Sequence, residues 1–159
     1  MADFLIWRDE WRTGIDWIDA DHRQIAELLN QLVEVNACAA RVPYPRCPDA
    51  AKDECLATLD ALIERTRRHF QAEEAYLREI CFPGYGDHCR EHGLQIAEFT
   101  DMRRTLGQDG SPVLGPDILD EFKRWFFNHV MSEDRAYVDY HHQVAGRSPP
   151  PGANAAADC

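Results

Sequence analysis

The chain has 159 residues, a formal net charge of −11, six cysteines and seven histidines. This length fits one domain with a genuine core, and 45% apolar residues are too many for a disordered chain. The acidic balance disfavours binding to nucleic acid or docking on an anionic membrane, because both need clustered lysine and arginine. The sequence has no run of membrane-spanning length and no signal-peptide pattern. We therefore expect a cytoplasmic protein whose cysteines are free thiols, with Cys38 and Cys47 able to pair under oxidation.

An aromatic N-terminal arm precedes two predicted helices. We expect residues 1–18 to pack on the domain as an ordered arm, rich in the aromatic side chains of Phe4, Trp7, Trp11 and Trp17. Apolar residues at spacings of three and four predict a first helix from Asp19 to about Cys38, with Asp19 or Asp21 as its cap, and a second from about Leu56 to Ile80. Three prolines within residues 39–49 predict a loop between them.

Two more helical patterns follow, and strand-like alternation is absent from the sequence. The third helix is predicted from Tyr85 to a glycine cap at Gly107, and the fourth from Pro116 to about His142. The predicted fold class is all-α, an up-down-up-down four-helix bundle. We expect the domain to cover residues 1–143, and residues 144–159, rich in proline and alanine, to form a flexible, disordered tail.

Five of the seven histidines lie on the apolar stripes of the predicted helices, at least one from each: His22, His69, His88, His92 and His129. His69 and Glu73 are four residues apart and share a helix face, as do His88 and His92. A single histidine of this kind is more often a satisfied core residue than a ligand. Burying five imidazoles without strong partners would cost on the order of 1–3 kcal/mol each. A bound metal offsets that cost and explains the coincidence.

The donor set narrows the kind of metal site. Imidazole and carboxylate ligands suit zinc, iron, copper or nickel, but five imidazoles and two carboxylates exceed one tetrahedral zinc site. A two-metal centre with bridging carboxylates fits better. The sequence lacks the Glu-x-x-His pairs of oxygen-activating di-iron proteins. Neutral imidazoles support the highest oxidation states of iron less well than carboxylates, which favours reversible oxygen binding over substrate oxidation.

Four segments resemble the motifs of the hemerythrin family, and the resemblance covers about residues 7–140. The stretch from Gly14 to His22 (GIDWIDADH) is similar to the opening motif of the family. His69-Phe70-Gln71-Ala72-Glu73 is similar to its His-x-x-x-Glu segment, and Pro83-Gly84-Tyr85 leads to a similar His88-x-x-x-His92. His129 and Asp134 match its His-x-x-x-x-Asp. The single-domain bacteriohemerythrins are the most similar members.

The resemblance implies a non-heme centre of two iron ions with an oxo or hydroxo bridge. By position, His88, His92 and His129 would hold one iron, and His22 and His69 the other. Glu73 and Asp134 would bridge the pair. This arrangement leaves one position open on the second iron, where dioxygen would bind. Because residues five apart on an ideal helix diverge by about 140°, we expect either a local distortion between His129 and Asp134 or a side chain that reaches across to the site.

The expected function is therefore reversible dioxygen binding for transport, storage or delivery, rather than catalysis. The expected partners are dioxygen and an oxygen-consuming enzyme, and the expected state is a monomer. The ligand set alone leaves open an oxygen or redox sensor module, or a di-iron reductase acting on nitric oxide or peroxide. Apolar residues expected around the open position, equally explained as plain core, are Ile25, Phe70, Trp125, Phe126 and Val130. Glu74 and Glu133 are expected to be solvated or to support the ligands from outside.

Overall fold

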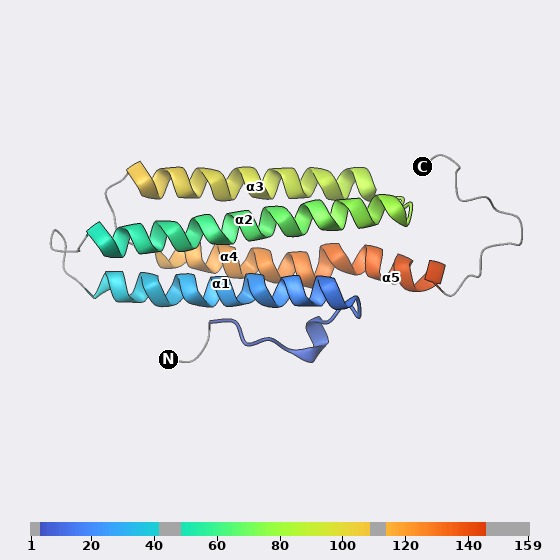
Figure 1. Ribbon diagram of the computed structural model, residues 1–159, viewed down its shortest axis with the longest axis horizontal. Coiled ribbons are helices and arrows are strands. Elements are labelled where there is room, and N and C mark those ends of the chain that lie inside the picture. Colours follow the sequence, from blue (N-terminus) through green and yellow to red (C-terminus); the bar gives the residue numbers. More distant parts are fainter. Residues whose placement is uncertain (1–3, 42–48, 109–113, 146–159) are drawn as a thin grey trace, which may run out of the picture.

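The computed structural model describes residues 4–41, 49–108 and 114–145, which form a bundle of antiparallel helical rods (Figure 1). The first three rods are α1 (Asp16–Ala40), α2 (Asp49–Glu79) and α3 (Tyr85–Gln108). The fourth consists of α4 (Pro116–Asn128), the π-helical turn η2 (His129–Glu133) and α5 (Asp134–Ala145). Consecutive rods run in opposite directions, and the described residues contain no strand. The predicted all-α, up-down-up-down architecture is confirmed.

The helices extend beyond several of their predicted ends. The first begins at Asp16 instead of Asp19, and the second begins at Asp49, well before Leu56. Gly107 lies inside α3 and does not cap it, and α5 continues to Ala145. The predicted domain boundary at residue 143 therefore falls within a helix, while residues 146–159 of the predicted tail lie outside the described residues.

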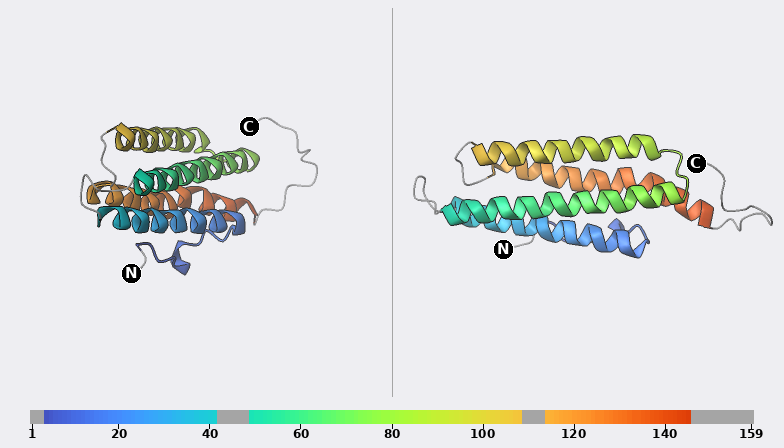
Figure 2. Two further views of the ribbon diagram at one scale, coloured as in Figure 1. Left: turned by 60° about the vertical axis from the view of Figure 1, so that its left-hand side comes forward. Right: turned by 45° about the horizontal axis from the view of Figure 1, so that its top comes forward.

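The N-terminal arm runs along the outside of α1 and includes a short 3-10 helix, η1 (Asp9–Trp11), as Figure 2 shows from two further sides. The Leu5 amide donates to the Asn30 side chain at 2.7 Å, and the Asn30 amide nitrogen donates back to the Leu5 carbonyl at 2.8 Å. Trp11 is buried, with its ring centroid 5.0 Å from that of Phe127. The prediction of an ordered, packed arm is confirmed for residues 4–15, while residues 16–18 belong to α1 and residues 1–3 lie outside the described residues.

Asp19 joins the arm to α1, although it was expected to cap the helix. Its carboxylate accepts hydrogen bonds from the Thr13 amide at 2.7 Å and from the Thr13 hydroxyl at 2.8 Å. The Gly14 amide donates to the same carboxylate at 3.3 Å, and its φ of +81° suits a residue without a Cβ. Asp19 is 1% exposed, so these donors supply the partners that a buried carboxylate requires.

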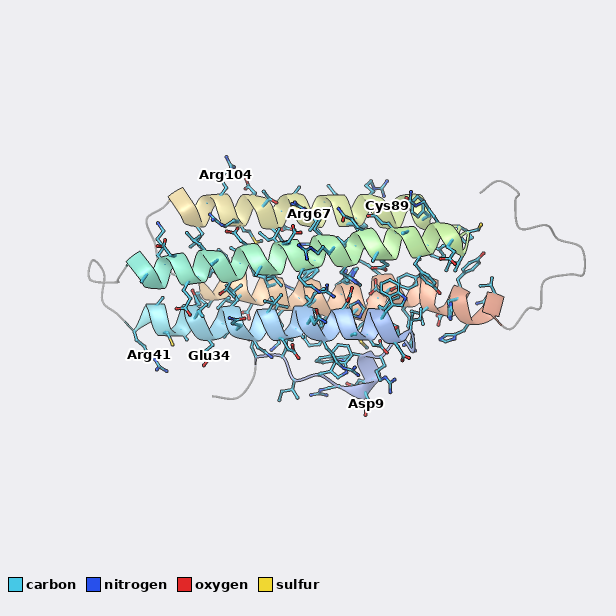
Figure 3. The ribbon with its side chains drawn as sticks, viewed as in Figure 1. Asp9, Glu34, Arg41, Arg67, Cys89 and Arg104 are labelled. Carbon is cyan, nitrogen blue, oxygen red and sulfur yellow. The ribbon has the colours of Figure 1, made fainter. Side chains whose placement is uncertain are left out.

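Two apolar clusters fill the interior, and a polar layer separates them. The larger cluster includes Ile25 of α1, Phe70 of α2 and Val130 of η2. The smaller is formed by Ile18, Leu77, Tyr137 and Val138. Between these clusters, the buried residues are Asp19 and His22 on α1, Glu73 on α2 and Asp134 on the fourth rod. Charged side chains such as Glu34 and Arg104 point away from the bundle (Figure 3).

The cysteines follow the expectation only in part. Cys38, Cys55 and Cys89 are free thiols. Cys81 is disulfide-bonded, which corrects the prediction that all six are free. The ability of Cys38 to pair with Cys47 under oxidation stays a prediction. Cys47 lies outside the described residues. Among the described residues, no helix is both long and apolar enough to cross a membrane.

Candidate metal centre

The polar layer contains all seven side chains that the sequence predicted as metal ligands. Each is at most 7% exposed, and they come from all four rods: His22, His69, Glu73, His88, His92, His129 and Asp134. Their donor atoms fall into two groups, within each of which all atoms lie within 4.8 Å of one another. One group consists of His22, His69, His129 and Asp134, and the other of Glu73, His88 and His92.

Glu73 connects the two groups. Its Oε1 lies 3.0 Å from Nε2 of His88, and its Oε2 lies 3.1 Å from Nε2 of His69. Asp134 Oδ2 lies 3.0 Å from Nε2 of His22, and Asp134 Oδ1 lies 3.9 Å from Nε2 of His88. Each carboxylate therefore reaches imidazoles of both groups, as a bridging ligand must.

The spacing of the nitrogens fits bound cations. Nε2 of His69 lies 3.2 Å from Nε2 of His22 and 3.4 Å from Nε2 of His129. Imidazole nitrogens bind a first-row divalent ion at about 2.1 Å, so two adjacent ligands on one ion lie about 3 Å apart. Several inner atoms are buried without a hydrogen-bond partner: Glu73 Oε2, His92 Nε2 and both Asp134 oxygens. Buried polar atoms are rarely left this way, and a metal would supply the missing partner.

The position of His129 differs from the expected division of ligands. The resemblance assigns it to His88 and His92, yet its Nε2 falls in the group with His22 and His69. The same nitrogen is 3.9 Å from Glu73 Oε2 and 3.5 Å from Asp134 Oδ1, and the ring stacks on that of His88 with centroids 6.2 Å apart. His129 thus lies between the two groups.

The π-helical turn explains how residues five apart reach the same layer. The Asp134 amide donates to the carbonyl of His129, the hydrogen bond that defines a π turn. This one wide turn reduces the divergence of the two side chains, which are 1% and 0% exposed. Of the two alternatives expected from the sequence, the local distortion is confirmed, and it has the form of a π turn.

Burial keeps most of the inner imidazoles neutral. It lowers the pKa of His92 to about 2, and lowers those of His22 and His129 from the usual range. Burial also opposes charge on His69, but Asp21 and Glu73 outweigh it and raise the pKa of that residue. Neutral imidazoles present the lone pairs that a metal requires.

The pKa values of the two inner carboxylates, Glu73 and Asp134, are shifted in opposite directions. Burial opposes charge on both, but hydrogen bonds from His69 and His88 hold the pKa of Glu73 well below its usual range. Burial and the charge of Glu73 raise the pKa of Asp134 far above its usual range. Without a cation, the site therefore keeps one carboxylate ionised and the other protonated, and a cation would displace that proton.

Three further carboxylates, the outer carboxylates, contact the imidazoles on the Nδ1 side. Glu74 lies 3.0 Å from Nδ1 of His92, and Glu133 lies 3.3 Å from Nδ1 of His129. The supporting role expected for this pair is consistent with these contacts. Asp21 lies 3.4 Å from Nδ1 of His69 and also pairs with Arg65. The contact between Asp21 and His69 was not predicted from the sequence. The sequence does hold a pattern that could have indicated it, because each outer carboxylate is adjacent in the chain to one of the seven predicted ligands.

Two aromatic side chains pack directly on the imidazoles. The Phe70 ring is stacked on His92 with centroids 3.7 Å apart, and Trp125 is stacked on His129 at 5.9 Å. The other residues expected around an oxygen pocket, Ile25, Phe126 and Val130, are buried in the larger apolar cluster. Their role around an open metal position stays a prediction, since packing in a core accounts equally for their burial.

A four-helix bundle with a buried histidine and carboxylate layer defines a class of helical metal-binding proteins. Within this class, the chain belongs to the hemerythrin family, because the family model described as Hemerythrin HHE cation binding domain matches residues 13–140.

Similarity to known proteins supports membership of the hemerythrin family. The chain is 33% identical to a bacteriohemerythrin of Stenotrophomonas maltophilia over 139 residues, covering 85% of this chain and 80% of the relative. It is 29% identical to a bacteriohemerythrin of Ralstonia nicotianae over 151 residues, covering 95% and 96%. Among solved structures, a wild-type hemerythrin matches with a TM-score of 0.70 at 22% identity, covering 86% of this chain and 96% of that one. The last likeness supports the fold.

Proposed function

We propose that the protein binds dioxygen reversibly at a centre of two iron ions and serves in oxygen transport, storage or delivery. The observation that carries the proposal is a buried layer with five imidazoles and only two inner carboxylates. Such a donor set stabilises ferrous and ferric iron better than higher oxidation states. The relatives at 33% and 29% identity are named bacteriohemerythrins, which supports the same function.

Each inner residue has a proposed role. His22 and His69 hold one iron, and His88, His92 and His129 hold the other, with His129 placed close to both. Glu73 and Asp134 bridge the ions, as their contacts with imidazoles of both groups suggest. When bound, two ferrous ions supply the electrons that dioxygen takes up on binding and returns on release. If His129 joined His88 and His92, as the resemblance implies, the ion held by His22 and His69 would have fewer imidazoles and would keep a position for dioxygen.

The remaining contacts protect and orient this centre. Phe70 and Trp125 cover His92 and His129 and exclude water from that side. Trp125 is 9% exposed and Phe70 3%, so both belong to the wall between the site and solvent. The outer carboxylates hold the Nδ1 proton of each imidazole they face, which leaves Nε2 for the metal.

Optical spectroscopy through repeated cycles of oxygen and vacuum tests the proposal. Iron-loaded protein should develop a ligand-to-iron charge-transfer band under oxygen and lose it under vacuum over several cycles. The metal-free protein, put through the same cycles, is the control and should show no band. Immediate and irreversible oxidation of the iron in the first cycle would contradict reversible binding and favour a redox enzyme or a sensor.

Asp21→Asn should weaken iron binding without abolishing it. Loss of the carboxylate that faces His69 removes the group that orients this imidazole, an effect typically of about 10–100-fold in metal affinity. Titration with ferrous iron under anaerobic conditions measures the change. Glu64→Gln is the matched control, because Glu64 is exposed and, among the described contacts, pairs only with exposed Arg68. Equal affinities of the two variants would refute the orienting role of Asp21.

A further inference from the structure

A continuous series of aromatic rings leads from the candidate metal centre to the N-terminal arm. Trp125 is stacked on His129 with centroids 5.9 Å apart and an interplanar angle of 14°. The Trp125 ring is 6.3 Å from Phe126, and Phe126 is 6.1 Å from Trp11. The series ends at Trp7, 5.6 Å from Trp11. All these spacings lie in the range of direct aromatic contact.

Exposure increases from Phe126 to the arm, while Trp125 at the metal end of the series is 9% exposed. Phe126 is 1% exposed, Trp11 is 6% exposed, and Trp7 is half-buried at the protein surface. The arm is fixed in place by the paired hydrogen bonds between Leu5 and Asn30, so this end of the series is a defined part of the fold. Indole is among the most easily oxidised side-chain groups. Three indoles in one series therefore offer successive sites for a single positive charge that starts beside a ligand imidazole.

We propose that Trp125, Trp11 and Trp7 carry oxidising equivalents from the metal centre to the arm when the iron-loaded protein meets hydrogen peroxide. The inference rests on the proposed function, because it requires bound iron. With both irons already ferric, hydrogen peroxide takes up two electrons and two protons at the centre and gives two molecules of water. An arm tryptophan supplies both electrons and one proton, and the water molecule that adds its oxygen to the ring supplies the other proton. The balance is one tryptophan and one peroxide giving one hydroxytryptophan and one water.

Arg23 affects how the positive charge is distributed between the two arm indoles, Trp7 and Trp11. Its guanidinium lies 5.0 Å from the centroid of the Trp7 ring. A cation over an indole face is attracted to the neutral ring and disfavours a second positive charge on it. The charge is thus shared between Trp7, where water has better access, and Trp11, where no cation lies over the ring among the described contacts. Oxidation of either indole therefore shows that the positive charge has reached the arm.

Trp17 provides the internal comparison. It is 36% exposed, more than either arm indole, and its ring packs on Tyr76 at 5.8 Å. Among the described residues, no series of ring contacts connects Trp17 to a ligand imidazole. Radicals formed in bulk solvent would therefore oxidise Trp17 at least as readily as the arm, whereas internal transfer oxidises the arm.

The test is peptide mass spectrometry of iron-loaded, full-length protein treated anaerobically with hydrogen peroxide in isotopically labelled water. Iron content is measured first, so that failure of the proposed function shows as missing iron. With iron present, we expect oxygen from labelled water on Trp7 or Trp11 in excess of Trp17. Met131, which is 41% exposed, should form sulfoxide with or without iron and reports the peroxide dose.

Trp11→Phe interrupts the series but keeps an aromatic ring, and Trp17→Phe is the matched control. The first variant should lose the labelled oxygen on Trp7 while retaining its iron, and the second should keep it. The proposal is overturned if iron-loaded protein shows no oxidised arm indole, or if Trp17 is oxidised as strongly as the arm. Oxygen derived from peroxide instead of water on the arm would also overturn it.

Discussion

Glu73→Gln should reduce the iron bound per chain from two ions to at most one. Glu73 is fully buried, and its two oxygens contact imidazoles of the two different ligand groups. Removal of its charge leaves two cations in an apolar interior with one carboxylate fewer, and buried charges without partners are costly. Metal analysis after anaerobic reconstitution and desalting measures the loss.

Glu74→Gln is the matched control for this experiment. The two glutamates are adjacent in α2, and the substitution changes charge and size equally, but Glu74 is half-buried and contacts His92 from the Nδ1 side. At saturating iron this variant should still bind two ions, with affinity lowered in the manner expected for Asp21→Asn. If Glu74→Gln lost the iron and Glu73→Gln kept it, the assignment of inner and outer carboxylates would be wrong.

Six of the seven proposed ligands could be predicted from the sequence because helical periodicity places them on apolar faces, whereas Asp134 was implied only by the resemblance to the hemerythrin family. His69 and Glu73, like His88 and His92, are four residues apart, and that spacing places both side chains on one face wherever a helix forms. The apolar residues around them then determine that this face is buried. Both conditions are local, so neither required knowledge of how the four rods pack.

The sequence indicated the π turn without revealing its form. The spacing of five between His129 and Asp134 conflicts with an ideal helix, and some distortion follows from that conflict alone. An Asp134 side chain that extends across to the site, without any distortion of the backbone, would have resolved this conflict equally well. The structure resolves it through an Asp134 amide that donates to the His129 carbonyl. Choosing between these solutions depends on the packing of Val130 and Tyr137 into different apolar clusters, which is a tertiary effect.

Asp21 and Asp19 were misjudged because their partners lie elsewhere in the chain. Both are acidic residues near the start of a helix, where capping is the usual role. Asp19 instead binds the backbone of the arm, and Asp21 faces His69 on α2. Helix propensity and spacing describe one element at a time and cannot assign contacts between elements. The same limit applies to Cys81, whose disulfide cannot be deduced from spacing.

The metal-free protein should become less stable as the pH falls below about 6.5. His22, His92 and His129 have pKa values lowered by burial, so below their usual pKa of 6.5 the unfolded chain binds protons that the folded chain does not. Stability therefore rises with pH in this window. Asp134, whose pKa is raised, acts in the opposite direction above 3.8, but the three imidazoles outweigh it. About one to two pH units below 6.5, the slope should approach about 2.7 kcal/mol per pH unit, because three imidazole protons less the one held by Asp134 leave a net difference of two.

His92→Leu should reduce this slope by about 1.4 kcal/mol per pH unit, the contribution of one proton. The pKa of His92 is lowered to about 2, so the imidazole contributes across the entire range from pH 6.5 into strong acid. Urea unfolding of metal-free protein at a series of pH values measures the slope independently of the stability lost to the substitution itself. His142→Gln, at an exposed position of α5, is the control and should leave the slope unchanged. An unchanged slope in His92→Leu would mean that His92 is not held neutral in the folded protein. Because the imidazoles that destabilise the fold on protonation are also the proposed iron ligands, acid should release iron over the same pH range.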